Sequence, residues 1–190
     1  MSPLEVEQLG THFFFTRKFF LGEAVAGKIR AEAQNLPLNR AGIGRDHRLD
    51  DSVRSDELAW LTPQSATGAL AEAVTAFDSL MESLNEQAWL GLRSFDLQLA
   101  HYAPGSRYAR HRDAFPGQDN RRITAIVYLN PGWEPAHGGQ LRLHLQPPLD
   151  LEPTLDRLIV FRSEVVEHEV LEARAERWAL TAWYSAAPKS

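Results

Sequence analysis

The fold is decided by the stretch Arg177-Trp178-Ala179-Leu180-Thr181-Ala182-Trp183-Tyr184. Side chains of a β-strand alternate between two faces, so every second residue of this stretch shares a face. One face would carry Arg177, Ala179, Thr181 and Trp183. The other would carry Trp178, Leu180 and Tyr184. A purely structural strand rarely places an arginine and a threonine in the protein interior. The stretch therefore predicts a buried strand with one apolar face and one face of functional side chains.

Further short strands are predicted upstream of this stretch, at near-regular spacing. Their alternating or β-branched patterns cover residues 94–102, 122–129, 139–145 and 158–161. Turn signals separate them, namely Ala103-Pro104-Gly105, Asn130-Pro131-Gly132, His137-Gly138-Gly139 and Gln146-Pro147-Pro148. Several short strands with such spacing indicate a sandwich or barrel, and we expect a double-stranded jelly roll whose closed form protects the strand edges.

The first half of the chain has a different pattern. Residues 17–90 are expected to be mostly helical, with amphipathic helices at 23–32 and 65–84. Between them, residues 40–56 are rich in glycine and charge, which indicates an ordered loop or a lid that closes over a substrate. The predicted fold class is therefore mainly β with α (α+β), a double-stranded β-helix (jelly roll) core buttressed by N-terminal helices. We expect a single domain over 1–190, with helical support and a lid loop in about 1–92 and the jelly-roll core in about 93–185.

Composition narrows the classes of function. The chain has 190 residues, a formal net charge of −5 and no cysteine. The net charge argues against nucleic acid as a partner, and the lack of cysteine excludes disulfides, thiolate zinc sites, iron–sulfur clusters and cysteine nucleophiles. The first ten residues show no signal-peptide pattern and the apolar runs are too short to span a bilayer, so we expect a cytoplasmic location, no membrane partner and, by default, a monomer.

A candidate metal site is formed by His111, Asp113 and His168. Two imidazoles and one carboxylate can hold a divalent iron on one face and leave the opposite positions open. Arg177, nine residues after His168, could grip the far carboxylate of an oxo-acid. The His-x-Asp element alone is weak, because seven His and ten Asp in this length give about 0.4 such elements by chance. The alternative to a metal site is that these histidines are ordinary surface or core residues whose ring nitrogens are hydrogen-bonded within the protein.

Six segments, in order along the chain, carry a resemblance to a known family. They are 101–105 (HYAPG), 108–113 (YARHRD), 124–130 (TAIVYLN), 138–142 (GGQLR), 168–170 (HEV) and 177–184 (RWALTAWY). Residues 93–184 thereby resemble the catalytic core of iron(II)/2-oxoglutarate dioxygenases of the prolyl 4-hydroxylase type. Residues 38–45 (LNRAGIGR) resemble the bacterial subgroup closest to the animal oxygen-sensing prolyl hydroxylases, which is known for hydroxylating a proline of elongation factor Tu.

The resemblance implies a role for each matching residue. The iron(II) ligands would be His111, Asp113 and His168. The residues that bind 2-oxoglutarate would be Arg177, Tyr128, Tyr102 and Thr181, with Arg177 and the Tyr128 hydroxyl on its distal carboxylate. The residues that contact a peptide would be Trp183, Tyr108 and Arg121. The implied reaction consumes O2, hydroxylates C4 of a peptidyl proline, releases succinate and CO2, and uses ascorbate as reductant.

Each assignment has an ordinary alternative. By itself, a strand tyrosine such as Tyr128 is more often a core residue with its hydroxyl at the rim, by about three to one. Trp183 alone indicates core packing, and Arg121 with Arg122 is typical of a solvated pair at a strand start. The turn between Tyr102 and His111 is one residue shorter than in the animal enzymes, which affects the details of that loop.

Three other functions stay open at this point. An oxygenase of the same fold could act on a small molecule, another protein residue or an alkylated nucleobase, although the acidic charge disfavours the last. A cupin-like metal enzyme without 2-oxoglutarate would not need Arg177 and Tyr128 together. A non-catalytic binding module would leave the three metal ligands and the arginine unexplained.

Overall fold

The computed structural model describes residues 1–42, 50, 52–114 and 120–186. Within them the N-terminal part comprises α1 (Pro3–Thr11), β1 (Phe14–Arg17), α2 (Glu23–Ala33), β2 (Asn39–Arg40), β3 (Glu57–Leu61), η1 (Pro63–Ser65) and α3 (Gly68–Ala88). The C-terminal part comprises β4 (Ser94–Tyr102), β5 (Tyr108–His111), β6 (Arg121–Tyr128), η2 (Pro135–His137), β7 (Leu141–Leu143), β8 (Leu149–Leu151), β9 (Leu158–Arg162), β10 (His168–Val170) and β11 (Arg177–Ser185).

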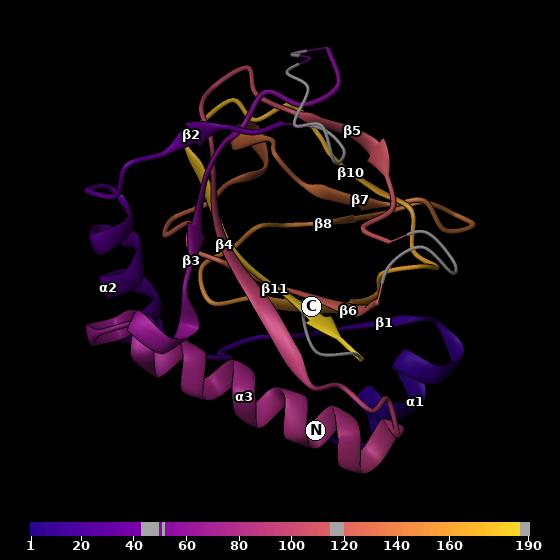
Figure 1. The fold of residues 1–190 in the computed structure, drawn as a ribbon. Helices are drawn as coiled ribbons and strands as arrows, with labels where there is room; N and C mark the ends of the chain where they lie inside the picture. Colours follow the sequence, from indigo (N-terminus) through magenta and orange to yellow (C-terminus); the bar gives the residue numbers. More distant parts are fainter. Residues whose placement is uncertain (43–49, 51, 115–119, 187–190) are drawn as a thin grey trace.

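The strands form two antiparallel sheets. The larger has the order β1-β9-β6-β11-β4-β3-β2 and the smaller has the order β5-β10-β7-β8. The helices lie on one side of the larger sheet, and the smaller sheet lies on the other side (Figure 1). This arrangement is the expected jelly roll buttressed by helices.

Strand β11 is central to the larger sheet, as the opening stretch predicts. It pairs on one side with β4, from Arg177 opposite Tyr102 to Ser185 opposite Ser94, and on the other side with β6. The predicted strand 94–102 matches β4 in both bounds, and the predictions at 122–129, 139–145 and 158–161 are confirmed as β6, β7 and β9 with small shifts at their ends.

The expectation that residues 17–90 are mostly helical is only half right. Helices α2 and α3 confirm the two predicted ones, but α3 begins at Gly68 because the 3₁₀ turn Pro63–Ser65 precedes it. The segment between the helices also contributes β2 and β3 to the larger sheet, and α1 and β1 precede the predicted region. Strand β3 is too short for a clear periodic signal, and its pairing with β4 decides its conformation.

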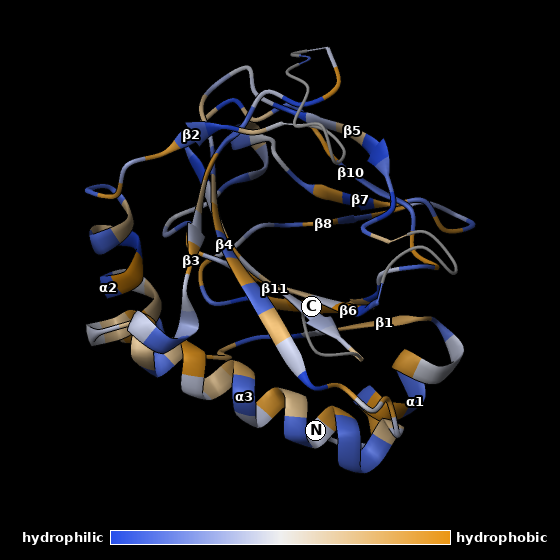
Figure 2. Cartoon of the chain, viewed as in Figure 1, coloured by the Kyte–Doolittle hydropathy of each residue, from blue (hydrophilic) through white to orange (hydrophobic). Residues whose placement is uncertain are grey.

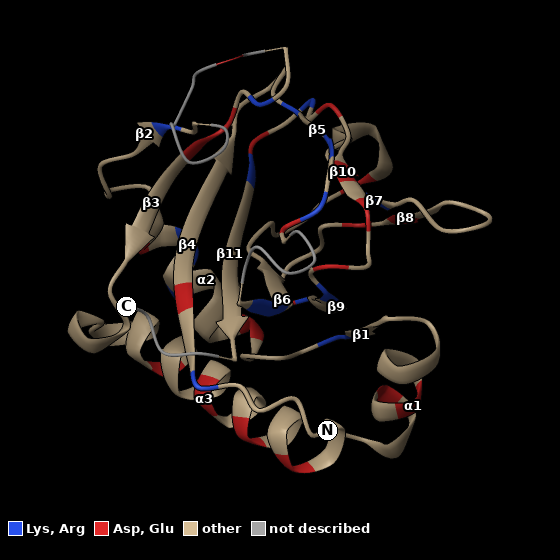
Figure 3. Ribbon diagram, turned by 45° about the vertical axis from the view of Figure 1, so that its right-hand side comes forward, with Lys and Arg blue, Asp and Glu red and all other residues tan. Residues whose placement is uncertain are grey.

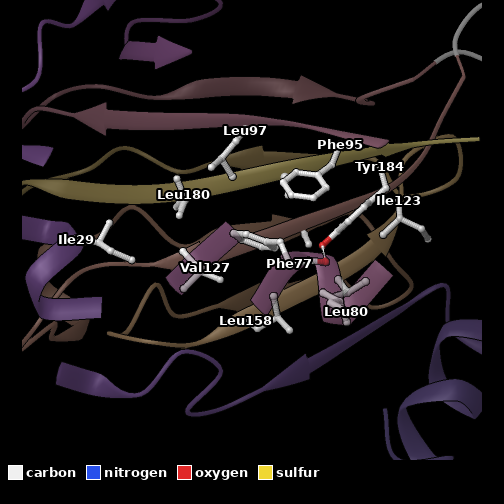
Figure 4. Packing of buried hydrophobic residues seen from close by; sticks show 14 of the residues in the cluster. Ile29, Phe77, Leu80, Phe95, Leu97, Ile123, Val127, Leu158, Leu180 and Tyr184 are labelled. Carbon is white, nitrogen blue, oxygen red and sulfur yellow. Dashed lines mark hydrogen bonds between the residues drawn. The ribbon is translucent and has the colours of Figure 1, made fainter. Parts of the chain in front are cut away.

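One core lies between the helices and the larger sheet. On α3 the buried residues recur every three or four positions, which places them on one face: Ala69, Ala73, Phe77, Leu80 and Leu84. Hydrophobic and hydrophilic residues accordingly alternate along this helix (Figure 2). Phe77 packs against the ring of Phe95, and its carbonyl accepts a hydrogen bond of 2.9 Å from the buried hydroxyl of Tyr184 (Figure 4).

A second core lies between the two sheets, and it positions the site. Ala179 belongs to it, together with Tyr102 and Tyr128, whereas Leu180 belongs to the core on the helix side. The two faces of β11 thus separate as the period of two predicts. None of the helices in the described part of the chain has the length and apolar character needed to cross a membrane.

Candidate metal centre and co-substrate pocket

His111, Asp113 and His168 converge between the sheets. Strand β10 pairs with β5 so that His168 lies opposite His111, while Asp113 follows two residues after the end of β5. The Oδ1 atom of Asp113 is 3.5 Å from Nε2 of His111 and 3.8 Å from Nε2 of His168. The ligand atoms of these residues all lie within 4.8 Å of one another, a spacing that suits a single metal ion.

Backbone carbonyls fix the orientation of both imidazoles. Nδ1 of His111 lies 2.8 Å from the carbonyl of Ala109, and Nδ1 of His168 lies 3.2 Å from that of Val166. A carbonyl oxygen only accepts, so each Nδ1 carries the proton and each Nε2 presents its lone pair to the site. Burial lowers the pKa of His168 to about 4, so this ring is neutral near pH 7, as a metal ligand must be.

The carboxylate of Asp113 is also oriented. The hydroxyl of Thr124 donates to its Oδ2 atom at 2.7 Å, which leaves Oδ1 directed at the two histidines. Burial raises the pKa of Asp113, but the neighbouring His168 and His111 outweigh burial and hold the pKa well below its usual value. The carboxylate is therefore ionised, and the chemistry of the three donors fits a divalent iron with open positions on the far side.

Beside the three ligands lies a buried pocket around Arg177. Only 3% of Arg177 is exposed; its Nε donates to the carbonyl of Gly139 at 2.7 Å, and its guanidinium lies 4.7 Å from the ring of Tyr102 and 5.0 Å from that of Tyr128. Among the described residues, no carboxylate pairs with this arginine and no group bonds the buried Tyr128 hydroxyl. A buried cation without a carboxylate partner and a buried hydroxyl without a hydrogen bond, among the described residues, fit the carboxylate of a bound ligand.

Thr181 and Trp183 lie on the same inward face of β11. Thr181 is buried between Gln98 of β4 and Ile126 of β6. The Trp183 ring packs against the half-exposed Trp60 with centroids 5.5 Å apart, so this face continues from the buried pocket to the surface.

Tyr108 and Arg121, the predicted peptide contacts, are engaged within the protein. The Tyr108 ring stacks on His111 at 3.7 Å between ring centroids, and the Arg54 guanidinium lies 4.4 Å from the same ring. Arg121 donates to the backbone carbonyl of Asp113 at 3.4 Å and lies 4.8 Å from the ring of Trp183. Both therefore border the metal ligands, and their role toward a peptide remains a prediction.

Several residues of the site were not singled out from the sequence. Thr124 could have been found, because the period of two places it on the face of Tyr128. Arg54 donates two hydrogen bonds to the carboxylate of Asp56, from Nε at 2.6 Å and from Nη2 at 2.9 Å. The spacing of these residues in the sequence does not predict this ion pair. A pocket of about 220 Å³ is lined by Asn39, Arg40, Gly42, Arg54, Leu58, Trp60 and Gln98. Most of the predicted lid, residues 43–49 and 51, lies outside the described residues.

Acidic residues are spaced along α3, on the side of the sheet away from the metal ligands (Figure 3). Around β5 and β10 basic and acidic residues lie next to one another, as in the ion pairs of Arg110 and Arg112 with Glu167. His101 is on the outward face of β4, where it stacks on Trp178 at 4.3 Å and lies 2.5 Å from a carboxylate oxygen of Glu176. His101 is therefore on the opposite face of β4 from Tyr102, and its neighbours are structural.

Fold and site together define the class: a jelly-roll protein that holds one divalent metal ion by two histidines and a carboxylate, beside a buried arginine for an acidic co-substrate. Comparison with known proteins agrees. Residues 97–185 match the sequence model of the 2OG-Fe(II) oxygenase superfamily. The chain is 30% identical to prolyl hydroxylase EGLN3 of Mus musculus over 191 aligned positions, which cover 87% of this chain and 75% of the relative.

Solved structures give the same answer. A prolyl-4-hydroxylase of Pseudomonas putida shares 35% identity and a TM-score of 0.86 over 97% of this chain and 98% of its own. A Trichoplax adhaerens prolyl hydroxylase was solved with a peptide of the hypoxia-inducible factor oxygen degradation domain. It shares 28% identity and a TM-score of 0.87 over 96% of this chain and 87% of its own. The chain therefore belongs to the 2OG-Fe(II) oxygenase superfamily, as an enzyme of the prolyl hydroxylase type that uses iron(II) and 2-oxoglutarate.

Proposed function

We propose that this enzyme hydroxylates a peptidyl proline at C4, with elongation factor Tu as its target and succinate and CO2 as co-products. The observation that carries the co-substrate half of this proposal is the buried pair of Arg177 and Tyr128 beside the three ligands. In 2-oxoglutarate two methylene groups separate the oxo-acid end from the distal carboxylate, which suits a site with a metal at one end and a guanidinium at the other.

Individual side chains have distinct tasks in this scheme. His111, Asp113 and His168 would hold iron(II), which together with 2-oxoglutarate supplies the oxidative chemistry that activates O2. Arg177 would bind the distal carboxylate through its fork of donors, and the Tyr128 hydroxyl would donate to the same carboxylate.

Other side chains shape the pocket. The Tyr102 ring, under the Arg177 guanidinium, would form the wall that sets the orientation of the co-substrate, and the Thr181 hydroxyl would provide a polar contact on the same face. The apolar groups that surround them keep water away from the reacting atoms.

The substrate side of the proposal rests on the surface that opens beyond Trp183. Trp183 and Trp60 present aromatic area, and the pocket lined in part by Leu58 and Gln98 adjoins them. Tyr108 and Arg121 border the same opening. The Trichoplax relative was solved with a bound peptide, which supports a protein as the substrate of this enzyme. Elongation factor Tu is proposed as the target because residues 38–45 resemble the bacterial subgroup that hydroxylates it. We also propose a cytoplasmic location, a monomeric state and ascorbate as the reductant.

The co-substrate half is tested by Arg177→Ala with Arg177→Lys as the matched variant. Arg177→Ala should lower 2-oxoglutarate turnover by at least about a hundredfold, because a buried two-point contact to a carboxylate is lost, while the affinity for Mn²⁺ stays unchanged. Arg177→Lys should retain part of the turnover, since lysine supplies the charge without the fork. Turnover at the wild-type level in Arg177→Ala would sink the 2-oxoglutarate assignment.

The substrate half is tested by intact-mass analysis of elongation factor Tu incubated with enzyme, iron(II), ascorbate and 2-oxoglutarate. The expected result is a gain of about 16 Da, one oxygen, that fragmentation places on a proline. Free proline, and elongation factor Tu with that proline replaced by alanine, serve as controls. Consumption of 2-oxoglutarate with free proline but not with the protein would favour the alternative, an oxygenase of small molecules. A gain on a residue other than proline would favour the other alternative, hydroxylation of a different protein residue.

A further inference from the structure

Asp113 is the least supported of the three ligands by secondary structure. His111 ends β5 and His168 begins β10, and the two strands pair with these residues opposite each other. Asp113 lies beyond the end of β5, where no strand ladder holds its backbone. Contacts outside a strand ladder therefore position it, and those of its carboxylate with Thr124 come from the larger sheet.

One buried hydroxyl contacts the Asp113 carboxylate, and a second buried hydroxyl contacts the first. The hydroxyl of Thr124, in β6, donates to Oδ2 of Asp113 at 2.7 Å, and it lies 2.9 Å from the hydroxyl of Ser163, the residue after β9. Both residues are completely buried, with relative exposures of 0%. Ser163 also accepts, through its carbonyl, a hydrogen bond of 3.3 Å from the backbone N–H of Ala114, next to Asp113.

The direction of these hydrogen bonds is determined by chemistry. An ionised carboxylate offers only acceptors, so the single proton of the Thr124 hydroxyl is committed to Oδ2. Ser163 must then be the donor to Thr124. The resulting series runs from Ser163 to Thr124 to Asp113, and it holds Oδ2 away from the two histidines while Oδ1 faces their Nε2 atoms at 3.5 and 3.8 Å.

We propose that Thr124 and Ser163 form a hydroxyl relay that positions Asp113 as a one-oxygen metal ligand. The inference rests on the metal site of the proposed function. Neither hydroxyl belongs to the group of candidate metal ligands, and both would act through Asp113. Keeping Oδ2 engaged prevents the carboxylate from binding the metal through both oxygens, which would occupy a coordination position that the co-substrate and O2 require.

The test measures Mn²⁺ and Co²⁺ binding rather than turnover. Thr124→Val removes the hydroxyl at nearly constant volume and should weaken Mn²⁺ affinity roughly tenfold to a hundredfold. Its Co²⁺ absorption spectrum should also shift toward higher coordination, as Asp113 becomes free to bind through both oxygens. Thr124→Ser, which restores the donor, should recover most of both properties.

Ser163→Ala tests whether Ser163 acts through Thr124, as a relay requires, or independently of it. Alone it should weaken Mn²⁺ affinity by several-fold, whereas in the Thr124→Val background it should add nothing, because Ser163 acts only through Thr124. Tyr184→Phe is the control: it removes a buried hydroxyl on the helix side of the same sheet, so it should lower stability without changing metal affinity.

Two outcomes overturn the relay. One is wild-type Mn²⁺ affinity and an unchanged Co²⁺ spectrum in Thr124→Val; the other is an equal further loss from Ser163→Ala in both backgrounds. If Thr124→Val does not fold, Thr124→Ala removes the same hydroxyl and takes its place, with Thr124→Ser as the variant that keeps it. Failure of the proposed function would look different, namely normal Mn²⁺ affinity in the wild-type protein without any 2-oxoglutarate turnover.

Discussion

Gly139 lies against Arg177 and leaves no room for a side chain. Its φ of +69° is in the left-handed region, and a Cβ there would lie 2.8 Å from Cδ of Arg177. Its carbonyl accepts the hydrogen bond from Nε of the same arginine. The glycine thus sets the position of the guanidinium from two directions, by a close approach and by an acceptor.

Gly139→Ala should therefore impair the co-substrate pocket selectively. The added methyl group would push the Arg177 stem aside and strain the backbone, so the KM for 2-oxoglutarate should rise by about tenfold or more. Mn²⁺ affinity should stay at the wild-type value, because the three ligands do not contact Gly139. Gly132→Ala is a suitable control, since that glycine also has positive φ, at +63°, but has nothing within 4 Å of an added Cβ. Equal effects of the two variants on KM would contradict this account.

At the scale of elements, an ion pair joins α1 to the larger sheet, beside the buried Leu9. The carboxylate of Glu5, in α1, accepts two hydrogen bonds from Arg17 of β1 at 2.7 and 2.8 Å, and one at 2.7 Å from the backbone of Ser2 at the helix start. Burial raises the pKa of Glu5, but the contacts with Arg17 and Ser2 outweigh burial and lower it overall. The ionised form is thus favoured in the folded protein.

This shift predicts the direction of a pH dependence. Because the pKa of Glu5 is lower in the folded than in the unfolded chain, its contribution to stability is present above the unfolded value of about 4.3 and is lost as the pH falls through the folded value. Glu5→Gln keeps an acceptor for the helix start but loses the charge, so it should cost roughly 1 kcal/mol at pH 7. Urea unfolding of both proteins from pH 7 to pH 3 checks this; a difference that grows toward low pH would be inconsistent with the ion pair.

At the scale of the whole molecule, the two cores lie on opposite faces of the larger sheet and serve different purposes. The core that includes α3 supplies stability, whereas the core between the sheets contains Tyr102, Tyr128 and the surroundings of the metal ligands. Phe77 belongs to the former; it is fully buried and its ring packs against Phe20 and Phe95.

Phe77→Ala should consequently lower stability without changing the site. The lost burial and the cavity should cost about 3–5 kcal/mol of unfolding free energy. The stabilisation by Mn²⁺ should remain equal to that of the wild-type protein, about 2.7 kcal/mol at a hundredfold excess over Kd. Thermal unfolding with and without Mn²⁺ measures both quantities, and Phe77→Leu provides a milder variant. A smaller metal-induced shift in the variants would show that the two cores are coupled.

Much of the fold follows from local patterns. The alternation in residues 94–102 and 177–184 is strong enough to define β4 and β11 and their faces, and the three-and-four spacing defines α3. Strand β3 and the short β5, β8 and β10 have no such pattern, since they contain three to five residues and depend on pairing with distant partners. The first half is less helical than predicted because β3, one of these short strands, lies between α2 and α3.

The sequence by itself determined the family, the ligand triad His111, Asp113 and His168, and the inward face that carries Arg177 and Thr181, because these depend on residue type, order and the period of two. Only the tertiary structure decided how Asp113 is held, which residues Arg177 contacts, and that Tyr108 stacks on His111. Those contacts join residues of separate strands, such as Thr124 to Asp113 and Arg177 to Gly139. Sequence spacing carries no information about distances across two sheets, so such contacts are set when the sheets pack together.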